Sequence, residues 1–188
     1  MTNPSSLCEA SDSALIVIDI QPILTTAMPD DDAQQMLANA ESLLQACDAL
    51  QIPVLMTEQY PKGLGETEPS LLDKLPSSAE RFDKTGFSCC AAEGFMESLE
   101  QTGRKQVVLV GQEAHVCVLQ TAVELTQAGY AVFVAEDSVC SRKQEHRFFA
   151  LERMREADVT ISNYESVLFE WLRDSRHPNF KELSQLIR

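Results

Sequence analysis

The chain has 188 residues, of which 44% are hydrophobic and 23% are charged, and its formal net charge is −14. This length suits a single domain with a buried core, and this hydrophobic content excludes a wholly disordered chain. The negative charge argues against nucleic acid and anionic membrane surfaces as partners, because an acidic protein surface repels both.

The N-terminal segment, MTNPSSLCEASDS, has neither a basic region nor an apolar stretch, so we predict no secretory leader. No apolar run approaches the roughly 20 residues that a membrane-spanning helix needs. The six cysteines include no C-x-x-C pair, which favours free thiols over a zinc ribbon or a redox pair. We therefore expect a cytoplasmic protein with one domain over residues 1–188, of which residues 1–12 form a flexible tail.

The first half of the chain begins with a continuous, β-branched apolar run that is typical of a strand buried on both faces. Helical spacing of apolar residues and a second apolar run follow it. We predict, in order, a strand over 14–20, a helix over 31–51, a strand over 53–57, an irregular segment over 58–78, a short strand over 81–84 and a helix over 91–101. Irregular segments as long as 58–78 are often functional.

The second half repeats the alternation of strand and helix. We predict a strand over 106–111, a helix over 115–127, a strand over 130–135, a helix over 143–156, a strand over 159–161 and closing helices over 164–172 and 180–187. Buried strands that alternate with helices indicate βαβ units. The fold class is therefore α/β, with three layers: a mostly parallel six-stranded sheet and helices on both of its faces.

Three chemically notable residues follow predicted strands. Asp19 ends the first strand, Lys84 ends the third, and Cys117 follows the fourth. Ligands of such sheets bind beyond the carboxyl ends of the strands, so the three residues mark a candidate site.

Cys117 lies after a buried strand and a turn, where a helix opens. The free N–H groups and the dipole of a helix N-terminus favour a thiolate, so this position predicts a lowered pKa and a place for an oxyanion. By position alone, however, a buried structural cysteine is the commoner explanation.

Asp19 and Lys84 are also ambiguous when each is taken alone. A carboxylate at the end of an apolar run must be satisfied by a cation, by backbone donors or by a proton. Asp19 could equally cap a nearby loop or helix, and a lone lysine is usually solvated. If Lys84 lies near Asp19 and Cys117, its charge favours the anionic form of both.

Three ordered blocks give the chain a family resemblance. They are VIDIQ at 17–21, FDKTGFS at 82–88 and GQEAHVCV at 111–118, and with them the chain resembles the isochorismatase-like cysteine hydrolases over nearly its whole length. The segment TEQYPKGLG at 57–65 resembles one subgroup of that family. The resemblance implies the α/β fold described above and a hydrolase activity.

The resemblance also implies a role for each candidate. Cys117 would be the nucleophile, Asp19 would take its proton and later activate water, and Lys84 would lower the thiol pKa and hold the other two. A non-proline cis peptide would join Gln112 to Glu113, and the backbone N–H groups of Glu113 and Cys117 would form the oxyanion hole.

Four further residues are candidates for the substrate pocket because they adjoin the catalytic residues or the long irregular segment. They are Gln21, Tyr60, Phe87 and His115, and ordinary packing is the alternative for each. Nicotinamidases of the family bind a metal through an aspartate and histidines near the second strand. Here residues 58–61 read EQYP and contain no histidine, so we expect no metal and no cofactor, and a nicotinamide substrate is disfavoured.

Our prediction is a metal-independent cysteine hydrolase that acts on a small amide or a related carbonyl compound. The alternative from another class is a noncatalytic binding or scaffold protein that keeps the fold. A ribonuclease conflicts with the net charge. The resemblance implies a homo-oligomer, either a dimer or a tetramer, and the helical spacing of Phe148 and Phe169 suits helix core or a subunit interface.

Overall fold

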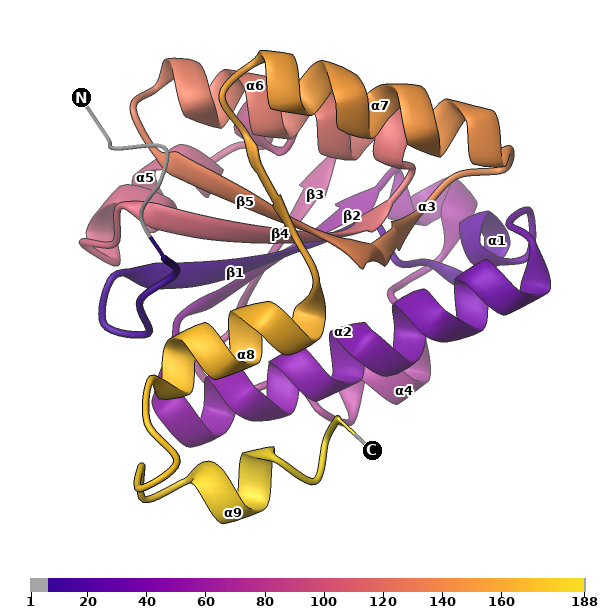
Figure 1. Ribbon diagram of the computed structural model, residues 1–188. Coiled ribbons are helices and arrows are strands. Elements are labelled where there is room, and N and C mark those ends of the chain that lie inside the picture. Colours follow the sequence, from indigo (N-terminus) through magenta and orange to yellow (C-terminus); the bar gives the residue numbers. More distant parts are fainter. Residues whose placement is uncertain (1–6, 188) are drawn as a thin grey trace.

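Six parallel strands form one sheet in a computed structural model that describes residues 7–187 (Figure 1). Their order across the sheet is β3-β2-β1-β4-β5-β6, and every neighbouring pair is parallel. The strands are β1 (Ser13–Ile18), β2 (Val54–Gln59), β3 (Glu80–Lys84), β4 (Gln106–Gln112), β5 (Ala131–Cys140) and β6 (Thr160–Ser162). The predicted α/β fold is confirmed.

The order of the strands reverses at β1. The chain runs outward from β1 through β2 to β3, and then returns to add β4 on the other side of β1. The connections that leave the carboxyl ends of β1 and β4 therefore diverge. In sheets of this kind such a switch point is the usual place for a ligand.

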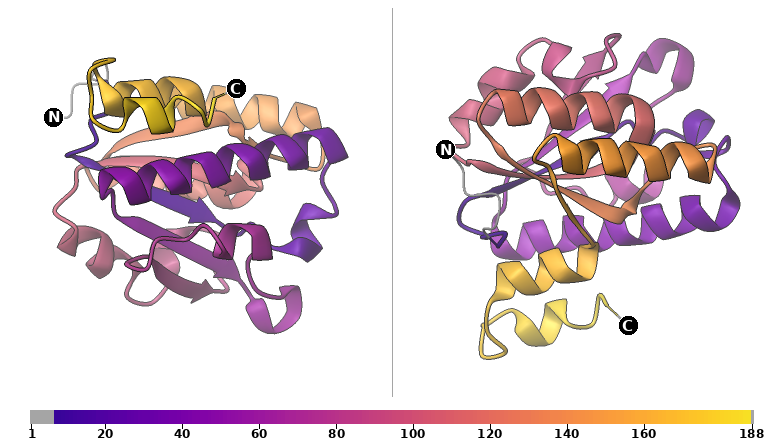
Figure 2. Two further views of the ribbon diagram at one scale, coloured as in Figure 1. Left: turned by 90° about the horizontal axis from the view of Figure 1, so that it is seen from below. Right: turned by 45° about the horizontal axis from the view of Figure 1, so that its top comes forward.

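Helices cover both faces of the sheet (Figures 1 and 2). One face carries α2 (Asp30–Leu50), α4 (Pro69–Leu72), α8 (Tyr164–Leu172) and α9 (Phe180–Leu183). The other face carries α5 (Phe95–Gln101), α6 (Leu119–Gln127) and α7 (Gln144–Glu156). The remaining helical elements are α1 (Pro22–Thr25), α3 (Pro61–Leu64), the 3-10 turn Cys89–Ala91 and the π turn Ala114–Val118.

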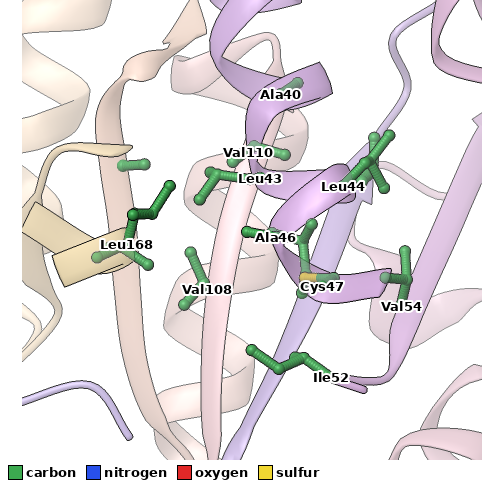
Figure 3. Close-up of a cluster of buried hydrophobic side chains, with 14 of the residues drawn as sticks. Ala40, Leu43, Leu44, Ala46, Cys47, Ile52, Val54, Val108, Val110 and Leu168 are labelled. Carbon is green, nitrogen blue, oxygen red and sulfur yellow. The ribbon is translucent and has the colours of Figure 1, made fainter. Parts of the chain in front are cut away.

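Alternate residues of β1 point to the two faces, as the period of a strand requires. Leu15 and Val17 pack with α2, whereas Ile16 and Ile18 pack with the helices of the opposite face. Figure 3 shows the α2 side of the core, where Leu43 lies against the strands. Each such side chain contributes about 1.5–3 kcal/mol when it is fully buried, so both faces anchor the sheet.

The segment predicted to be irregular, 58–78, contains two single-turn helices. Both α3 and α4 begin with proline, whose fixed φ suits the first helical position. Several element bounds also differ from expectation. β1 ends at Ile18 rather than at 20, and α5 begins at Phe95 rather than at 91. β5 continues to Cys140 rather than stopping at 135, and α9 ends at Leu183 rather than at 187.

The predicted tail, residues 1–12, is only partly described, because residues 1–6 lie outside the described part of the chain. From residue 7 onward the chain packs on the domain. Cys8 is fully buried, and its backbone N–H donates to Glu170 Oε2 at 2.6 Å. None of the helices in residues 7–187 is long and apolar enough to cross a membrane.

Candidate active site

Asp19 is the first residue after β1, and its side chain is excluded from solvent. Its φ of 52° lies in the left-handed region, which aspartate tolerates better than most residues. The neighbouring strand β2 holds it at two points. Its backbone N–H donates to Thr57 O at 3.1 Å, and its Oδ1 accepts a hydrogen bond from Thr57 Oγ1 at 2.8 Å.

Lys84 ends β3, and its side chain is also fully buried. Its ammonium nitrogen lies 2.7 Å from Asp19 Oδ2. It also donates to Gln59 Oε1 at 2.5 Å and to Phe87 O at 2.8 Å. Lys84 is therefore the cation that satisfies Asp19, and the solvated-lysine alternative is wrong.

Cys117 lies in the π turn Ala114–Val118, which leads from β4 into α6. Its Sγ is 3.6 Å from Lys84 Nζ, and the residue is 6% exposed. The candidate nucleophile is therefore nearly as buried as its charged neighbours. The three residues that the sequence singled out are brought together at the switch point.

Gly111 permits β4 to approach β1 closely beneath this site. Its φ is +120°, and a Cβ placed on it would lie 2.1 Å from Ile18 O. Only glycine suits both conditions. Two residues later, the peptide between Gln112 and Glu113 is cis, as the family resemblance implies. The side-chain Nε2 of Gln112 donates to the backbone oxygen of Asp19 at 3.2 Å, and this hydrogen bond links the end of β4 to the end of β1.

The electrostatics of the site differ from the expectation of a lowered thiol pKa. Burial raises the pKa of Cys117, the Asp19 carboxylate raises it further, and Lys84 opposes the change only in part. Burial also raises the pKa of Asp19, against the opposing effects of Lys84 and Thr57. The physical reason is that one buried ammonium can balance one anion but not two. The site therefore favours a single negative charge, and one proton remains on the pair Asp19 and Cys117.

Two residues of the site were not identified from the sequence. Thr57 and Gln59 supply hydrogen bonds to Asp19 and Lys84, respectively, and both lie on β2. The signal that could have found them is position: β2 lies between β1 and β3, so its carboxyl end must separate Asp19 from Lys84.

The four predicted pocket residues have different surroundings. Gln21 is fully buried, and its amide exchanges hydrogen bonds with the backbone of Gln59, so it braces the segment after β2. Tyr60 and Phe87 are exposed at the carboxyl edge of the sheet. His115 Nδ1 lies 3.0 Å from Ser141 Oγ.

A cavity of about 300 Å³ adjoins the carboxyl end of β3. Among its lining residues are Tyr60, Lys62, Asp83 and Thr85. Lys84 also borders it, and its side chain is excluded from solvent. Of the predicted pocket residues, Tyr60 borders this cavity.

The described residues contain no group of three or more histidine, cysteine, aspartate or glutamate side chains placed to hold a metal ion. All six cysteines lie in the described part of the chain and are free. Five of them are buried, and Cys90 is half-buried.

Fold and site together define an α/β domain with a buried aspartate, lysine and cysteine at the switch point of its sheet. The isochorismatase domain matches residues 13–166. The chain belongs to the isochorismatase family, and it has the hydrolase fold of that family.

Known proteins similar to this chain have varied descriptions. Isochorismatase domain-containing protein 2 of Danio rerio is 42% identical over 153 residues, which cover 81% of this chain and 76% of the relative. The MAR1 ribonuclease of Caenorhabditis elegans has a TM-score of 0.91 and 37% identity, covering 97% of this chain and 92% of that one. The YcaC gene product of Escherichia coli, an octameric hydrolase of unknown specificity, has a TM-score of 0.89 and 25% identity, covering 99% and 91%.

Proposed function

We propose that the protein is a metal-independent cysteine hydrolase that cleaves a small amide or a related carbonyl compound. The observation that carries this proposal is the buried contact of Lys84 with Asp19 at 2.7 Å, beside the Sγ of Cys117 at 3.6 Å. A buried ion pair is costly unless its partners are well satisfied. Its position next to a thiol at the switch point of the sheet favours a catalytic use over a structural one.

The charge balance of the site suggests how the thiol is activated. Moving the proton from Cys117 to Asp19 exchanges one anion for another beside the same ammonium, so the net charge of the site stays at zero. The transfer therefore avoids the cost of adding a second buried anion. The thiol acts as a nucleophile when substrate is present, and it is mostly protonated at rest.

The proposed reaction has two halves. Sγ of Cys117 attacks the substrate carbonyl carbon while Asp19 takes the thiol proton, and the backbone N–H groups of Glu113 and Cys117 stabilise the oxyanion. The C–N bond then breaks, the amine leaves with the proton from Asp19, and a thioester remains. Water attacks the thioester while Asp19 takes a proton from it. The C–S bond breaks, and the proton returns to the thiolate.

Two other functions have weaker support. A noncatalytic scaffold has no need for a buried aspartate and lysine beside a thiol. The description of a relative as a ribonuclease suggests RNA as a substrate. The net charge of −14 opposes that choice, because binding to a phosphate backbone gains its affinity from basic surface.

We further propose that the protein is cytoplasmic and forms a homo-oligomer, either a dimer or a tetramer. Six free thiols suit a reducing compartment. Phe148 and Phe149 lie next to each other on α7 with exposures of 59% and 62%, and their rings make an edge-to-face contact. Adjacent aromatic rings with this exposure are typical of a surface that a subunit covers.

The reaction is tested by mass spectrometry of the intact protein after mixing with small amides and with the activated ester p-nitrophenyl acetate. We expect an acyl adduct on Cys117 and release of the amine or alcohol. Cys117→Ala should show neither, whereas Cys90→Ser, which removes the most accessible of the other thiols, should behave like the wild type. Equal hydrolysis by Cys117→Ala and wild type would rule out the mechanism.

A further inference from the structure

The ammonium group of Lys84 has more acceptors around it than protons to give. Lysine carries three N–H donors. Three oxygens lie within 2.8 Å of Nζ: Gln59 Oε1 at 2.5 Å, Asp19 Oδ2 at 2.7 Å and Phe87 O at 2.8 Å. Two acceptors lie farther away: Gly86 O at 3.3 Å and the Sγ of Cys117 at 3.6 Å. All three donors are therefore occupied by oxygen, and Lys84 acts on the thiol through its charge rather than through a full hydrogen bond.

Gln59 differs from the other two acceptors. Asp19 is part of the proposed chemistry, and the Phe87 acceptor is a backbone oxygen. Gln59 is a neutral side chain, half-buried where β2 ends. It alone of the three can be exchanged without changing the reacting groups or the backbone.

The amide of Gln59 has a defined orientation. Its Nε2 donates to Thr85 O at 2.9 Å, so its Oε1 must face the ammonium of Lys84, which can only donate. Its backbone is held as well: its N–H donates to Gln21 Oε1 at 2.7 Å, and its carbonyl accepts from Gln21 Nε2 at 3.0 Å. A residue held at three points besides its contact with Lys84 can fix the position of that charged neighbour.

We propose that Gln59 is a positioning residue that holds the Lys84 ammonium between Asp19 and Cys117 and keeps its third N–H away from the sulfur. This inference rests on the proposed function of the same site. A neutral acceptor is suited to the role, because it occupies the N–H without cancelling the charge that the thiolate needs. The titratable or charged groups that face the thiol are Asp19, Lys84 and Cys89.

The test is the pH dependence of Cys117 alkylation by iodoacetamide, followed by peptide mass spectrometry. Gln59→Glu keeps an acceptor in place but adds a negative charge beside Lys84. We expect it to move the alkylation midpoint upward by about one pH unit or more. Gln101→Glu is the matched control. Gln101 is exposed at the end of α5, shortly before β4 begins, so it lies near the amino ends of the strands and away from the site at their carboxyl ends. It should leave the midpoint within about 0.2 units of the wild type.

A second variant tests the proposal if the first does not fold. Gln59→Met has a similar length and no amide, so one N–H of Lys84 is released to the two remaining neighbours, Gly86 O at 3.3 Å and the sulfur at 3.6 Å. We expect the midpoint to fall by about half a unit or more, because that N–H then stabilises the thiolate. A midpoint unchanged from the wild type in either folded variant would overturn the proposal. Alkylation needs no substrate, so this result is independent of whether Cys117→Ala abolishes hydrolysis.

Discussion

The ammonium nitrogen of Lys84 lies 2.7 Å from Asp19 Oδ2, and the side chains of both residues are fully excluded from solvent. The charge of Lys84 is already balanced by Asp19, so it can only partly stabilise a thiolate at Cys117. Burial and the Asp19 carboxylate raise the pKa of that thiol, and Lys84 compensates only in part. The reactivity of Cys117 should therefore depend more on Asp19 than on its position at the start of a helix.

The first prediction separates thiol reactivity from turnover. Asp19→Asn removes the anion but leaves the ammonium, so Lys84 is free to balance a thiolate. We expect the alkylation midpoint of Cys117 to fall by about two pH units, while acyl turnover is lost because no base remains. In the wild type the midpoint should lie above that of a free thiol, about 8.5.

The matched control for that substitution is Asp83→Asn, which neutralises an exposed carboxylate on the residue before Lys84. Its midpoint should match the wild type, because exposed charges are screened. Iodoacetamide labelling with peptide mass spectrometry measures all three proteins. A midpoint in Asp19→Asn equal to that of the wild type would show that the two residues are not coupled.

The second prediction concerns the hydroxyl of Thr57, which donates to Asp19 Oδ1 at 2.8 Å and lowers the pKa of that carboxylate. Thr57→Val removes the donor and keeps the shape, so the pKa of Asp19 should rise further. Asp19 must be ionised to take a proton, and activity is therefore lost as the pH falls through its pKa. We expect the acid limb of kcat/KM for p-nitrophenyl acetate to move to higher pH, with a fall of about tenfold near neutral pH.

The control for Thr57→Val is Thr126→Val on α6. Thr126 donates to Ala122 O within its own helix and has no contact with the site. Its pH profile should overlay that of the wild type. If Thr57→Val also leaves the acid limb in place, the hydrogen bond to Asp19 has no part in the reaction.

The third prediction tests the close approach of β4 to β1. Gly111→Ala places a Cβ 2.1 Å from Ile18 O at a φ of +120°, so both overlap and backbone strain oppose it. We expect a loss of about 3 kcal/mol or more in the free energy of unfolding. Gly103→Ala, at a φ of +70° with no atom within 4 Å of the added Cβ, isolates the strain and should cost about 1–2 kcal/mol. Urea unfolding compares them, and equal losses would show that the overlap is relieved without cost.

The fourth prediction concerns subunit assembly. In sedimentation velocity the wild type should have the mass of a dimer or a tetramer. Replacing both Phe148 and Phe149 by serine should lower that mass, because the exposed aromatic pair on α7 would no longer be covered. Phe169→Ser, on the opposite face of the sheet, is the control. A monomeric wild type would refute the assembly outright.

Much of the fold could be predicted because its signals are local. The apolar run at 14–20 and the glycines and prolines between elements reflect burial and turn geometry that depend on neighbouring residues. The predicted end of β5 at residue 135 was wrong because the local signal misleads there. Glu136 and Asp137 end the apolar run, yet the strand continues to Cys140, since Val139 and Cys140 pair with Gly111 and Gln112 of β4 beyond a shift in register.

The site was predicted less completely because its interactions are not local. Asp19, Lys84 and Cys117 could be identified by their positions after strands and by family resemblance. The direction of the thiol pKa could not, because it depends on how deeply the carboxylate and the sulfur are buried together. Gln59 was overlooked for a similar reason: a glutamine in an irregular segment carries no signal of the lysine 25 residues away that it contacts.

The spacing of the three central residues along the chain has a consequence for biosynthesis. Asp19 and Lys84 are 65 residues apart, and Lys84 and Cys117 are 33 apart, so the site is built from distant contacts. Distant pairings form late, because the entropy of closing each loop is lost before the contacts compensate for it. A nascent chain that has emerged as far as β3 carries the base and the lysine but no nucleophile. The site can be completed only after β4 and the turn beyond it have emerged from the ribosome and added to the sheet, so a growing chain has no active nucleophile before that point.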